Sequence, residues 1–443
     1  MKIQLSDHFT YQRLLHFCLP SIVMMIFTSI YGVVDGLFVS NFVGKIPFAA
    51  INLVMPFIMI LGGFGFMIGT GGSALIAKTL GEGNHKLANR YFSMLIIMTV
   101  ILGFFLTTIG IVFARRVSIL LGATDVMLDD CVIYLRTVLL FISPFMLQNV
   151  FQSFLVTAQK PHAGLIVTII AGLTNMSLDA LFIVVFRWGV AGAALATGIS
   201  QCIGGLLPLI LFLGKNDSLL HLVPTRLEWR PFFLSCTNGM SELMGNISSS
   251  IVSMLYNFQL LNYAGENGIA AYGVLMYVQF IFIAVFFGYT IGVGPVIGYH
   301  YGAGNHAELK NLLRKSLKLN IITGISMTIL ANLFAGALSR IFVGYDPELY
   351  AMTKSAFHIF ALSFLVCGIN IFASAFFTAL NNGLVSAVIS FLRTLVFQVG
   401  SVLILPTFLG LTGIWLSNTF ADLMAMLISI IFLAAMRKRY HYA

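Results

Sequence analysis

The sequence has few charged residues. Asp, Glu, Lys and Arg make up only 9% of its 443 residues, whereas a soluble globular domain carries about 25%. So few charges cannot cover a water-facing surface of this size, which excludes an ordinary soluble protein. The hydrophobic content of 59% and the mean hydropathy of +0.97 instead indicate that lipid is the solvent for most of the surface.

Motifs for several kinds of chemistry are also missing. The sequence contains no HExxH, GxGxxG or Walker motif, and its 9 histidines support no Ser/His/Asp arrangement. An ATP-driven pump is therefore disfavoured, and we expect neither enzymatic activity nor a cofactor. The 5 cysteines show no CxxC spacing, so we expect no metal site beyond Na⁺ at a cation site. The net charge of +9 is spread between hydrophobic runs, and we expect no nucleic-acid partner.

Long apolar runs, by contrast, are abundant. A bilayer core requires about 20 apolar residues of helix. The start of the chain is polar and the apolar run after it is too long for a cleavable signal, so this run predicts the first spanning helix. The sequence predicts twelve spans, at residues 14–39, 50–76, 91–113, 131–156, 163–186, 189–213, 232–260, 269–299, 316–338, 351–380, 384–408 and 411–436.

The distribution of basic residues predicts the orientation of these spans. If the N-terminus is inside, 16 of the 24 Lys and Arg residues lie in inside segments and 6 lie in outside segments. Cytoplasmic loops of membrane proteins carry an excess of Lys and Arg. We therefore expect a multi-pass protein of the bacterial cytoplasmic membrane with both termini in the cytoplasm.

The two halves of the chain repeat each other. The segment Gly81-Glu82-Gly83-Asn84-His85 recurs as Gly302-Ala303-Gly304-Asn305-His306. We call the spacing from position 81 to position 302 the repeat offset. Three further matches have this same spacing. The repeat predicts an N-terminal six-helix lobe at 1–213 that carries the cation site, a cytoplasmic linker at 214–231 and a C-terminal six-helix lobe at 232–443. Transporters with such repeats alternate access around a site between or within the halves, which favours them over a receptor or channel.

Two acidic residues, Asp35 and Asp179, lie inside apolar spans of the first half. A carboxylate there costs at least ~2.5–3.5 kcal/mol on insertion scales. It is retained if it is functional, or if it makes a structural polar contact. The positions one repeat offset later are Tyr256 and Gly400, which carry no carboxylate. This asymmetry predicts a function confined to the first half.

Counting residues from the predicted outer face places these acids at one depth. Asp35, Asp179 and Thr197 all come out roughly 9–14 Å below that face, and Asn175 lies one helical turn from Asp179. Such oxygen donors suit a hard cation, and two neighbouring carboxylates can also share a proton at neutral pH. The sequence leaves Na⁺ and H⁺ open as the bound ion.

These residues carry a family likeness. The stretch Tyr31-Gly-Val-Val-Asp35-Gly-Leu-Phe-Val resembles the first-helix signature of the multidrug and toxic compound extrusion (MATE) family. Asn175-Met-Ser-Leu-Asp179-Ala-Leu-Phe-Ile, followed by Gly189-Val-Ala-Gly-Ala-Ala-Leu-Ala-Thr197, resembles its fifth- and sixth-helix signature.

The resemblance implies an all-α membrane protein in which twelve helices form two six-helix bundles arranged in a V. It implies antiport, in which Na⁺ or H⁺ enters and an organic, often cationic, compound leaves. In this family the cation site of the N-lobe would consist of Asp35, Asn175, Asp179 and Thr197, with the carbonyl of Ala193, and the cavity would be lined by Tyr31 and Gln152.

The second half departs from branches of the family that carry acids midway along the seventh and tenth helices. Its tenth span has no acid, and Glu242 lies near the inner end of the seventh. Glu242, Arg393 and Asp422 come out near the bilayer midplane, where charges usually pair. We expect an Arg393–carboxylate contact, which is either a structural ion pair or part of the substrate cavity. Asn149 faces either this cavity or another helix.

Two other functions fit parts of the pattern. A flippase for a lipid-linked sugar or similar amphipathic lipid needs a strongly cationic cavity, but only Arg136 and Arg393 lie within spans. An intramembrane aspartyl protease would use the Asp35/Asp179 pair, but neither residue follows a Gly-x-Gly sequence. The sequence therefore favours a monomeric exporter of small organic molecules, surrounded by membrane lipid.

Overall fold

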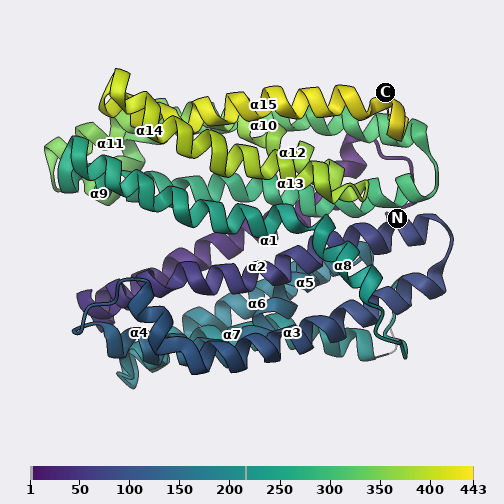
Figure 1. Cartoon of the computed structure of the whole chain (residues 1–443), viewed down its shortest axis with the longest axis horizontal. Coiled ribbons are helices and arrows are strands. Elements are labelled where there is room, and N and C mark those ends of the chain that lie inside the picture. The colour runs from purple at the N-terminus through teal and green to yellow at the C-terminus, as the bar shows by residue number, and fades with distance from the viewer. Residues whose placement is uncertain (1–2, 215–216, 443) are drawn as a thin grey trace.

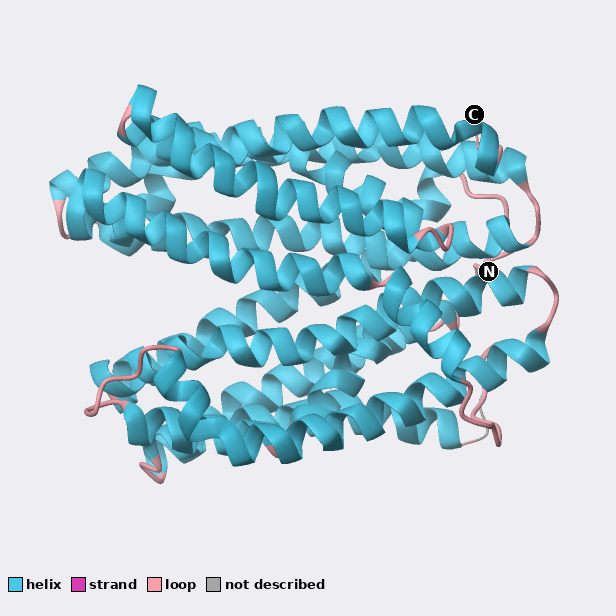
Figure 2. Ribbon diagram, in the orientation of Figure 1, coloured by secondary structure: helices cyan, strands magenta, loops and turns pink. Residues whose placement is uncertain are grey.

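The computed structural model describes residues 3–214 and 217–442. The predicted linker residues 215–216, the terminal residues 1–2 of the N-lobe and residue 443 of the C-lobe lie outside the described part. Two of the 16 basic residues counted in inside segments, Lys2 and Lys215, lie there too. Within the described ranges the chain is helical and contains no strand (Figure 2). This confirms the all-α class, as expected where backbone polar groups must be satisfied within lipid.

The first half forms the N-lobe, drawn purple to teal in Figure 1. Its elements are α1 (Tyr11–Phe38), η1 (Val39–Val43), α2 (Lys45–Gly81), α3 (His85–Leu120), α4 (Leu128–Leu139), α5 (Ile142–Thr157), α6 (Pro161–Asp179), η2 (Ala180–Val185) and α7 (Gly189–Leu213). The segments η1 and η2 are π-helical.

The second half forms the C-lobe, drawn teal-green to yellow. Its elements are α8 (Trp229–Asn238), α9 (Met240–Gly302), α10 (His306–Val343), α11 (Pro347–Phe360), η3 (Ala361–Ser363), α12 (Phe364–Ala379), α13 (Gly383–Phe391), η4 (Leu392–Phe397), α14 (Gln398–Leu409) and α15 (Leu411–Tyr440). The segment η4 is π-helical and η3 is a 3₁₀ turn.

The described helices account for the twelve predicted spans. Ten continuous helical stretches are long and apolar enough to cross a membrane, and α4 with α5 forms another that is bent by 57°. The 63-residue α9 contains a non-helical residue, Gly265, with φ 62° and ψ −152°. This residue divides α9 into two consecutive spans, which brings the total to twelve.

The repeat is visible in the local geometry. Six of the seven described glycines with positive φ form pairs separated by the repeat offset. The same offset relates Asn84 and Asn305, whose side chains cap α3 and α10. An L side chain is strained at a positive φ, so these turns require glycine in both halves. The glycine pairs are Gly44 and Gly265, Gly83 and Gly304, and Gly189 and Gly410.

The lobes meet along α1 and α2 on one side and α8 and α9 on the other. Both termini lie at the same end of the molecule (Figure 1), which we call the terminal end. There the two lobes approach very closely. A Cβ on Gly81 would lie 2.0 Å from the Tyr299 carbonyl oxygen, and one on Gly302 would lie 2.0 Å from that of Lys78. Gly81 and Gly302 are repeat partners, so their contacts are related by the pseudo-two-fold axis.

Hydrogen bonds between the lobes also concentrate toward this end. The side-chain amide of Asn381 donates to the Ala74 carbonyl (3.1 Å), and that of Asn238 donates to the Gly71 carbonyl (3.4 Å). Among the described residues, the cross-lobe hydrogen bond farthest along α1 is from the Ser29 hydroxyl to the Phe280 carbonyl (3.4 Å). The part of α1 that carries Asp35 therefore lies beyond the region where the lobes are hydrogen-bonded.

Candidate functional site

The two intramembrane acids lie where helices change their winding. Asp35 is three residues before the end of α1, which continues directly into the π-helical η1. Asp179 is the last residue of α6 and is followed by the π-helical η2. Short π-helical turns are rare and occur frequently at functional sites. The amino-acid pattern gave no indication of these turns.

The structure brings the predicted acids together. The carboxyl groups of Asp35 and Asp179 lie within hydrogen-bonding reach of each other. Asp179 is fully buried, at 0% exposure. Both acids face Tyr134 of α4, whose hydroxyl lies beside Thr197 of α7. The depth count above correctly grouped Asp35, Asp179 and Thr197, but it did not include Tyr134. A count of residues along the fourth span could have found it.

The polar atoms of this cluster have no partners within the described protein. The atoms concerned are one oxygen of Asp35, both oxygens of Asp179, both amide atoms of Asn175 and the hydroxyl oxygen of Thr197, and all are buried. A buried polar group without a hydrogen bond costs several kcal/mol, so native proteins rarely leave one unpaired. A cluster of such groups therefore calls for a bound ion, a proton or water. The donors are mostly oxygen atoms, which fits a hard cation.

A second polar layer lies one helical turn toward the terminal end. The Tyr31 ring packs against Gly172 of α6, where a Cβ would come within 2.9 Å of it. The Tyr31 hydroxyl lies beside the side chain of Gln148. The amide oxygens of Gln148, Gln152 and Gln201 are buried without a partner among the described residues. Gln201 was not among the predicted site residues, although it lies one turn from Thr197.

Two predicted site residues are placed by packing. Ala193 is fully buried on α7, one turn before Thr197. The small residues around it let α7 pack closely, since a Cβ on Gly198 would lie 2.1 Å from the Phe141 ring. Asn149 is buried on α5 and its amide donates to the Gly62 carbonyl of α2 (3.1 Å). Its side chain therefore makes a helix–helix contact.

The charged residues of the C-lobe form a separate cluster. Arg393 Nε donates to Asp422 Oδ1 at 3.0 Å, which confirms the expected Arg393–carboxylate contact. The amide of Asn370 donates to the Asp422 carbonyl at 2.8 Å. Glu242 lies near Arg393 and interacts with it electrostatically. Arg393 belongs to η4, so its helix, like those of the two acids, contains a π-helical segment.

The C-lobe positions equivalent to the acid pair are neutral. Tyr256, the counterpart of Asp35, is 1% exposed and stacks on Tyr272 with ring centroids 4.8 Å apart. Its hydroxyl lies beside Gln398 and Ser417. Gln398 Nε2 donates to the side-chain oxygen of Asn418 (2.7 Å), and Asn418 is the counterpart of Thr197. The Gln398–Asn418 bond joins neutral side chains here, whereas the N-lobe leaves carboxylates unpartnered among the described residues. The Tyr256 hydroxyl is itself buried without a hydrogen-bond partner among these residues.

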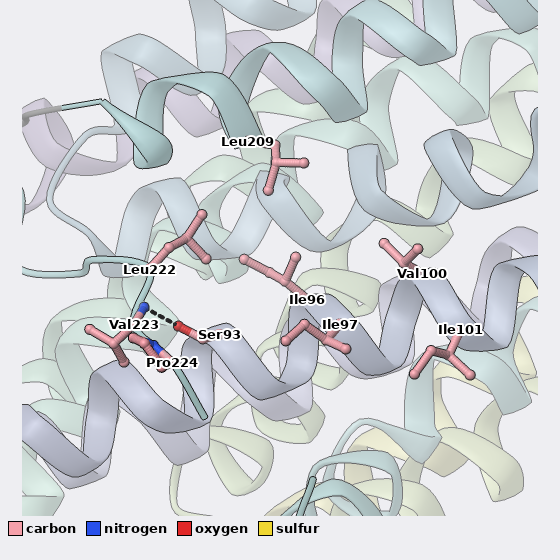
Figure 3. Close-up of a pocket in the computed structure, with 9 residues that line it drawn as sticks. All are labelled: Ser93, Ile96, Ile97, Val100, Ile101, Leu209, Leu222, Val223 and Pro224. Carbon is pink, nitrogen blue, oxygen red and sulfur yellow. Dashed lines mark hydrogen bonds between the residues drawn. The ribbon is translucent and has the colours of Figure 1, made fainter. Parts of the chain in front are cut away.

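A surface groove is formed by residues of α3, α7 and the linker (Figure 3). It has a volume of about 430 Å³ and an almost entirely apolar lining, and the hydroxyl of Ser93 accepts a hydrogen bond from the Val223 amide beside it (2.8 Å). None of its lining residues belongs to either polar cluster. The lining consists of Ser93, Ile96, Ile97, Val100, Ile101, Leu209, Leu222, Val223 and Pro224.

Comparison with known proteins identifies the family. The family model MatE matches the chain twice, over residues 20–181 and 243–404, so most of each lobe is covered. The chain belongs to the MatE family. This confirms the resemblance to the multidrug and toxic compound extrusion transporters. The multidrug export protein MepA of Staphylococcus haemolyticus is 25% identical over 436 residues, with 97% of this chain and 94% of the relative covered.

Solved structures show that this MatE protein shares the fold of the family. A MATE transporter crystallised in complex with MaL6 is 21% identical and has a TM-score of 0.93 over 98% of both chains. An outward-facing multidrug resistance MATE family transporter of the MOP superfamily is 21% identical and has a TM-score of 0.92 over 98% of both chains. These likenesses confirm the expected fold, in which two six-helix bundles are arranged in a V.

Proposed function

We propose that this MatE protein is a secondary antiporter of the bacterial cytoplasmic membrane. It exports organic, often cationic, compounds in exchange for Na⁺ or H⁺ by alternating access, and it functions as a monomer. The observation that carries this proposal is the cluster of Asp35, Asn175, Asp179 and Thr197. Its buried oxygen atoms, including one of the two of Asp35, lack hydrogen-bond partners among the described residues. The carbonyl of Ala193 completes the proposed cation site.

Electrostatics gives the reason for an ion at this site. Two carboxylates in contact repel each other strongly where the dielectric constant is low. No described basic side chain pairs with either one. A bound Na⁺ or a proton would relieve this repulsion and satisfy the unpartnered oxygens. The occupied and empty sites therefore differ considerably in free energy, as ion coupling requires.

The position of Asp35 suggests how ion binding couples to transport. It lies on α1, which packs on α6 within the N-lobe and on α9 of the C-lobe. A change in the Asp35–Asp179 contact therefore acts on a helix that both lobes share. With both termini in the cytoplasm, the close contacts at the terminal end would close the cytoplasmic side.

The substrate cavity is proposed to lie between the lobes. Tyr31 and Gln152 contribute from the N-lobe, and Glu242, Arg393 and Asp422 contribute from the C-lobe. Asn149, also considered for this cavity, instead joins α5 to α2 through the Gly62 carbonyl. Arg393 already pairs with Asp422, and Glu242 adds a further carboxyl group to the C-lobe cluster. When ionised, this carboxyl group favours a cationic substrate.

A lipid-linked sugar flippase is the second candidate, and the charges do not favour it. Moving a pyrophosphate group across the membrane requires free cationic side chains in the cavity. Arg393 is engaged by Asp422, and Arg136 is an exposed residue on α4. The described spans thus offer no cluster of unpaired basic residues.

Reconstitution into liposomes tests the proposal. Efflux of a cationic dye is measured while the Na⁺ gradient and the pH gradient are varied independently. We expect one of the two gradients to drive efflux, and Asp35→Asn or Asp179→Asn to abolish the ion-driven part. Asp129→Asn, an exposed carboxylate on α4, serves as the matched control and should leave efflux unchanged. Full ion-driven efflux by both site variants would contradict the proposed coupling site.

A further inference from the structure

The residues before α1 cross from one lobe to the other. Residues 3–10, which we call the N-terminal strap, lead into the first helix of the N-lobe but pack on the C-lobe. Leu5 and Phe9 are both 0% exposed. They belong to an apolar cluster that includes Leu309 and Leu312 of α10 and Phe376 of α12. Figure 1 shows the N-terminus at the boundary between the lobes.

One buried carboxylate on the C-lobe holds the strap. Glu308 lies in the first turn of α10, and its side chain is 6% exposed. Its Oε1 accepts a hydrogen bond from the Phe9 backbone amide (3.0 Å), and its Oε2 lies 2.6 Å from Nδ1 of His8. Both oxygens of Glu308 therefore bind strap residues, about 300 positions away in the sequence. Hydrogen bonds to a buried charge are the stronger kind.

The other side of the same peptide is also bound by α10. The Phe9 carbonyl accepts hydrogen bonds from Lys315 Nζ (2.6 Å) and from the side-chain amide of Asn311 (3.1 Å). Asn311 also donates to Glu308 Oε1 (2.8 Å). The C-lobe thus satisfies both the amide and the carbonyl of one strap residue. If the strap detached, Glu308 would lose two partners and two large apolar side chains would be exposed.

The chain has a second crossing that provides a comparison. The described linker residues 217–228 lie on α3 of the N-lobe and lead into α8 of the C-lobe. The His221 amide donates to Asn89 Oδ1 (2.9 Å), and Glu228 pairs with Arg90 (3.2 Å). Here the carboxylate is 46% exposed and its partner 44% exposed. An exposed ion pair contributes little to stability, so the two crossings differ mainly in the burial of their carboxylates.

We propose that the N-terminal strap is a latch that holds the terminal end closed, and that Glu308 is the residue that fastens it. Opening this end requires the N-lobe to separate from the C-lobe, while the strap ties α1 of one lobe to α10 of the other. The latch must therefore release before the terminal end opens. This inference rests on alternating access in the proposed function, but it does not depend on which ion is coupled.

The distance between the lobes tests the latch directly. Spin labels are attached to cysteines at the exposed positions Lys86 of α3 and Lys438 of α15, one in each lobe, after the native cysteines have been replaced by alanine. Double electron–electron resonance then reports the populations of the closed and open terminal end. The measurement needs no ion gradient or substrate, so it can succeed where the coupling proposal fails.

We expect Glu308→Gln to raise the open-to-closed population ratio about tenfold, because it removes the charge from two hydrogen bonds. His8→Ala removes only the contact between the exposed His8 ring and Glu308 and should raise the ratio about threefold. Glu228→Gln, the matched carboxylate of the linker crossing, should change the ratio less than about twofold. An unchanged ratio for both Glu308→Gln and His8→Ala would overturn the latch. So would an equal shift for Glu228→Gln.

Poor folding of Glu308→Gln would not prevent the test. The side chain of His8 is 67% exposed, so His8→Ala should fold. The lobe distances can then be measured on this variant alone. A strap that stays bound while the terminal end opens would also be detected. In that case a third label at Gln4 would keep a constant distance to Lys438 while the Lys86–Lys438 distance increases, and the latch would be rejected.

Discussion

The two lobes place different chemistry on the same framework. Asp35 and Thr197 of the N-lobe correspond to Tyr256 and Asn418 of the C-lobe, one repeat offset later. The N-lobe positions hold buried oxygen atoms without protein partners. The C-lobe positions hold neutral side chains, with Tyr256 stacked on Tyr272 and Asn418 bound to Gln398. A duplicated scaffold has thus kept its geometry, while only the N-lobe copy carries unpartnered carboxylates. The Tyr256 hydroxyl of the C-lobe also lacks a hydrogen-bond partner among the described residues, but it carries no charge.

The charges of the C-lobe support the same comparison. Its arginine and aspartate pair with each other at 3.0 Å, whereas no described basic side chain pairs with Asp35 or Asp179. The C-lobe satisfies most of its buried charge internally. Four predictions would break or sharpen this difference between the lobes.

The largest effect is expected at the N-lobe acids. Asp179→Asn and Asp35→Asn should each reduce ion-driven dye efflux by about 100-fold, the upper range of typical coupling free energies. Membrane expression should not fall, because an uncharged amide is cheaper than a carboxylate in lipid. Dye uptake into inverted vesicles, which corresponds to efflux from the cell, measures this when it is normalised to the amount of protein. A comparable loss in Tyr256→Phe would remove the proposed asymmetry between the lobes.

The second effect concerns the C-lobe ion pair. Arg393→Ala leaves Asp422 buried without its partner and should destabilise the protein by about 3–5 kcal/mol. Thermal unfolding in detergent, followed by tryptophan fluorescence, measures the change. The double variant Arg393→Met with Asp422→Leu should recover most of the loss, since it removes the unpaired Asp422 carboxylate. A stable Arg393→Ala protein that has lost transport would instead assign Arg393 to the substrate cavity.

The third effect should be the same in both lobes. Gly81→Ala and Gly302→Ala each place a methyl group about 2.0 Å from a carbonyl oxygen of the other lobe. Each should lower the stability of the closed terminal end by about 1–3 kcal/mol, as overpacking does. Gly83→Ala is a poor control because its φ is +79°, so Ala303→Ser at an exposed position serves instead. Clearly unequal effects at Gly81 and Gly302 would contradict the pseudo-two-fold interface.

The smallest effect is expected within the neutral network of the C-lobe. Gln398→Ala removes the hydrogen bond to Asn418 and should cost about 1 kcal/mol of stability. Efflux should stay within about twofold of the parent, because this network holds no ion. Parallel measurement of the unfolding temperature and of dye efflux separates the two outcomes. A large loss of efflux in a stable protein would indicate a second coupling site.

Much of the fold could be predicted from the sequence because lipid imposes simple rules. Spanning segments must be helical and about 20 residues long, so apolar runs located all twelve spans. The glycine repeat located the duplication, because turns such as those at Gly83 and Gly304 need a positive φ. The high cost of a carboxylate in lipid singled out Asp35 and Asp179. These features depend either on the local sequence or on the lipid solvent, so they can be predicted without knowing the tertiary contacts.

What could not be predicted depends on contacts between distant residues. The π-helical turns beside Asp35 and Asp179 leave no trace in hydrophobic periodicity, because they change the winding of only a few residues. The 57° bend between α4 and α5 falls inside the single apolar run predicted at 131–156, so hydropathy does not mark it. The sequence of the N-terminal strap is largely polar, so it resembles that of an ordinary free terminus. Its docking depends on Glu308, about 300 residues away.

Cation binding to the purified protein tests the central claim most directly. Na⁺ is titrated into the detergent-solubilised protein at fixed pH, and bound Na⁺ and released or absorbed protons are both measured. The account predicts one saturable site that is lost in the Asp35→Asn/Asp179→Asn double variant and retained in Tyr256→Phe. Undiminished cation and proton binding by the double variant would contradict a cation site confined to the N-lobe.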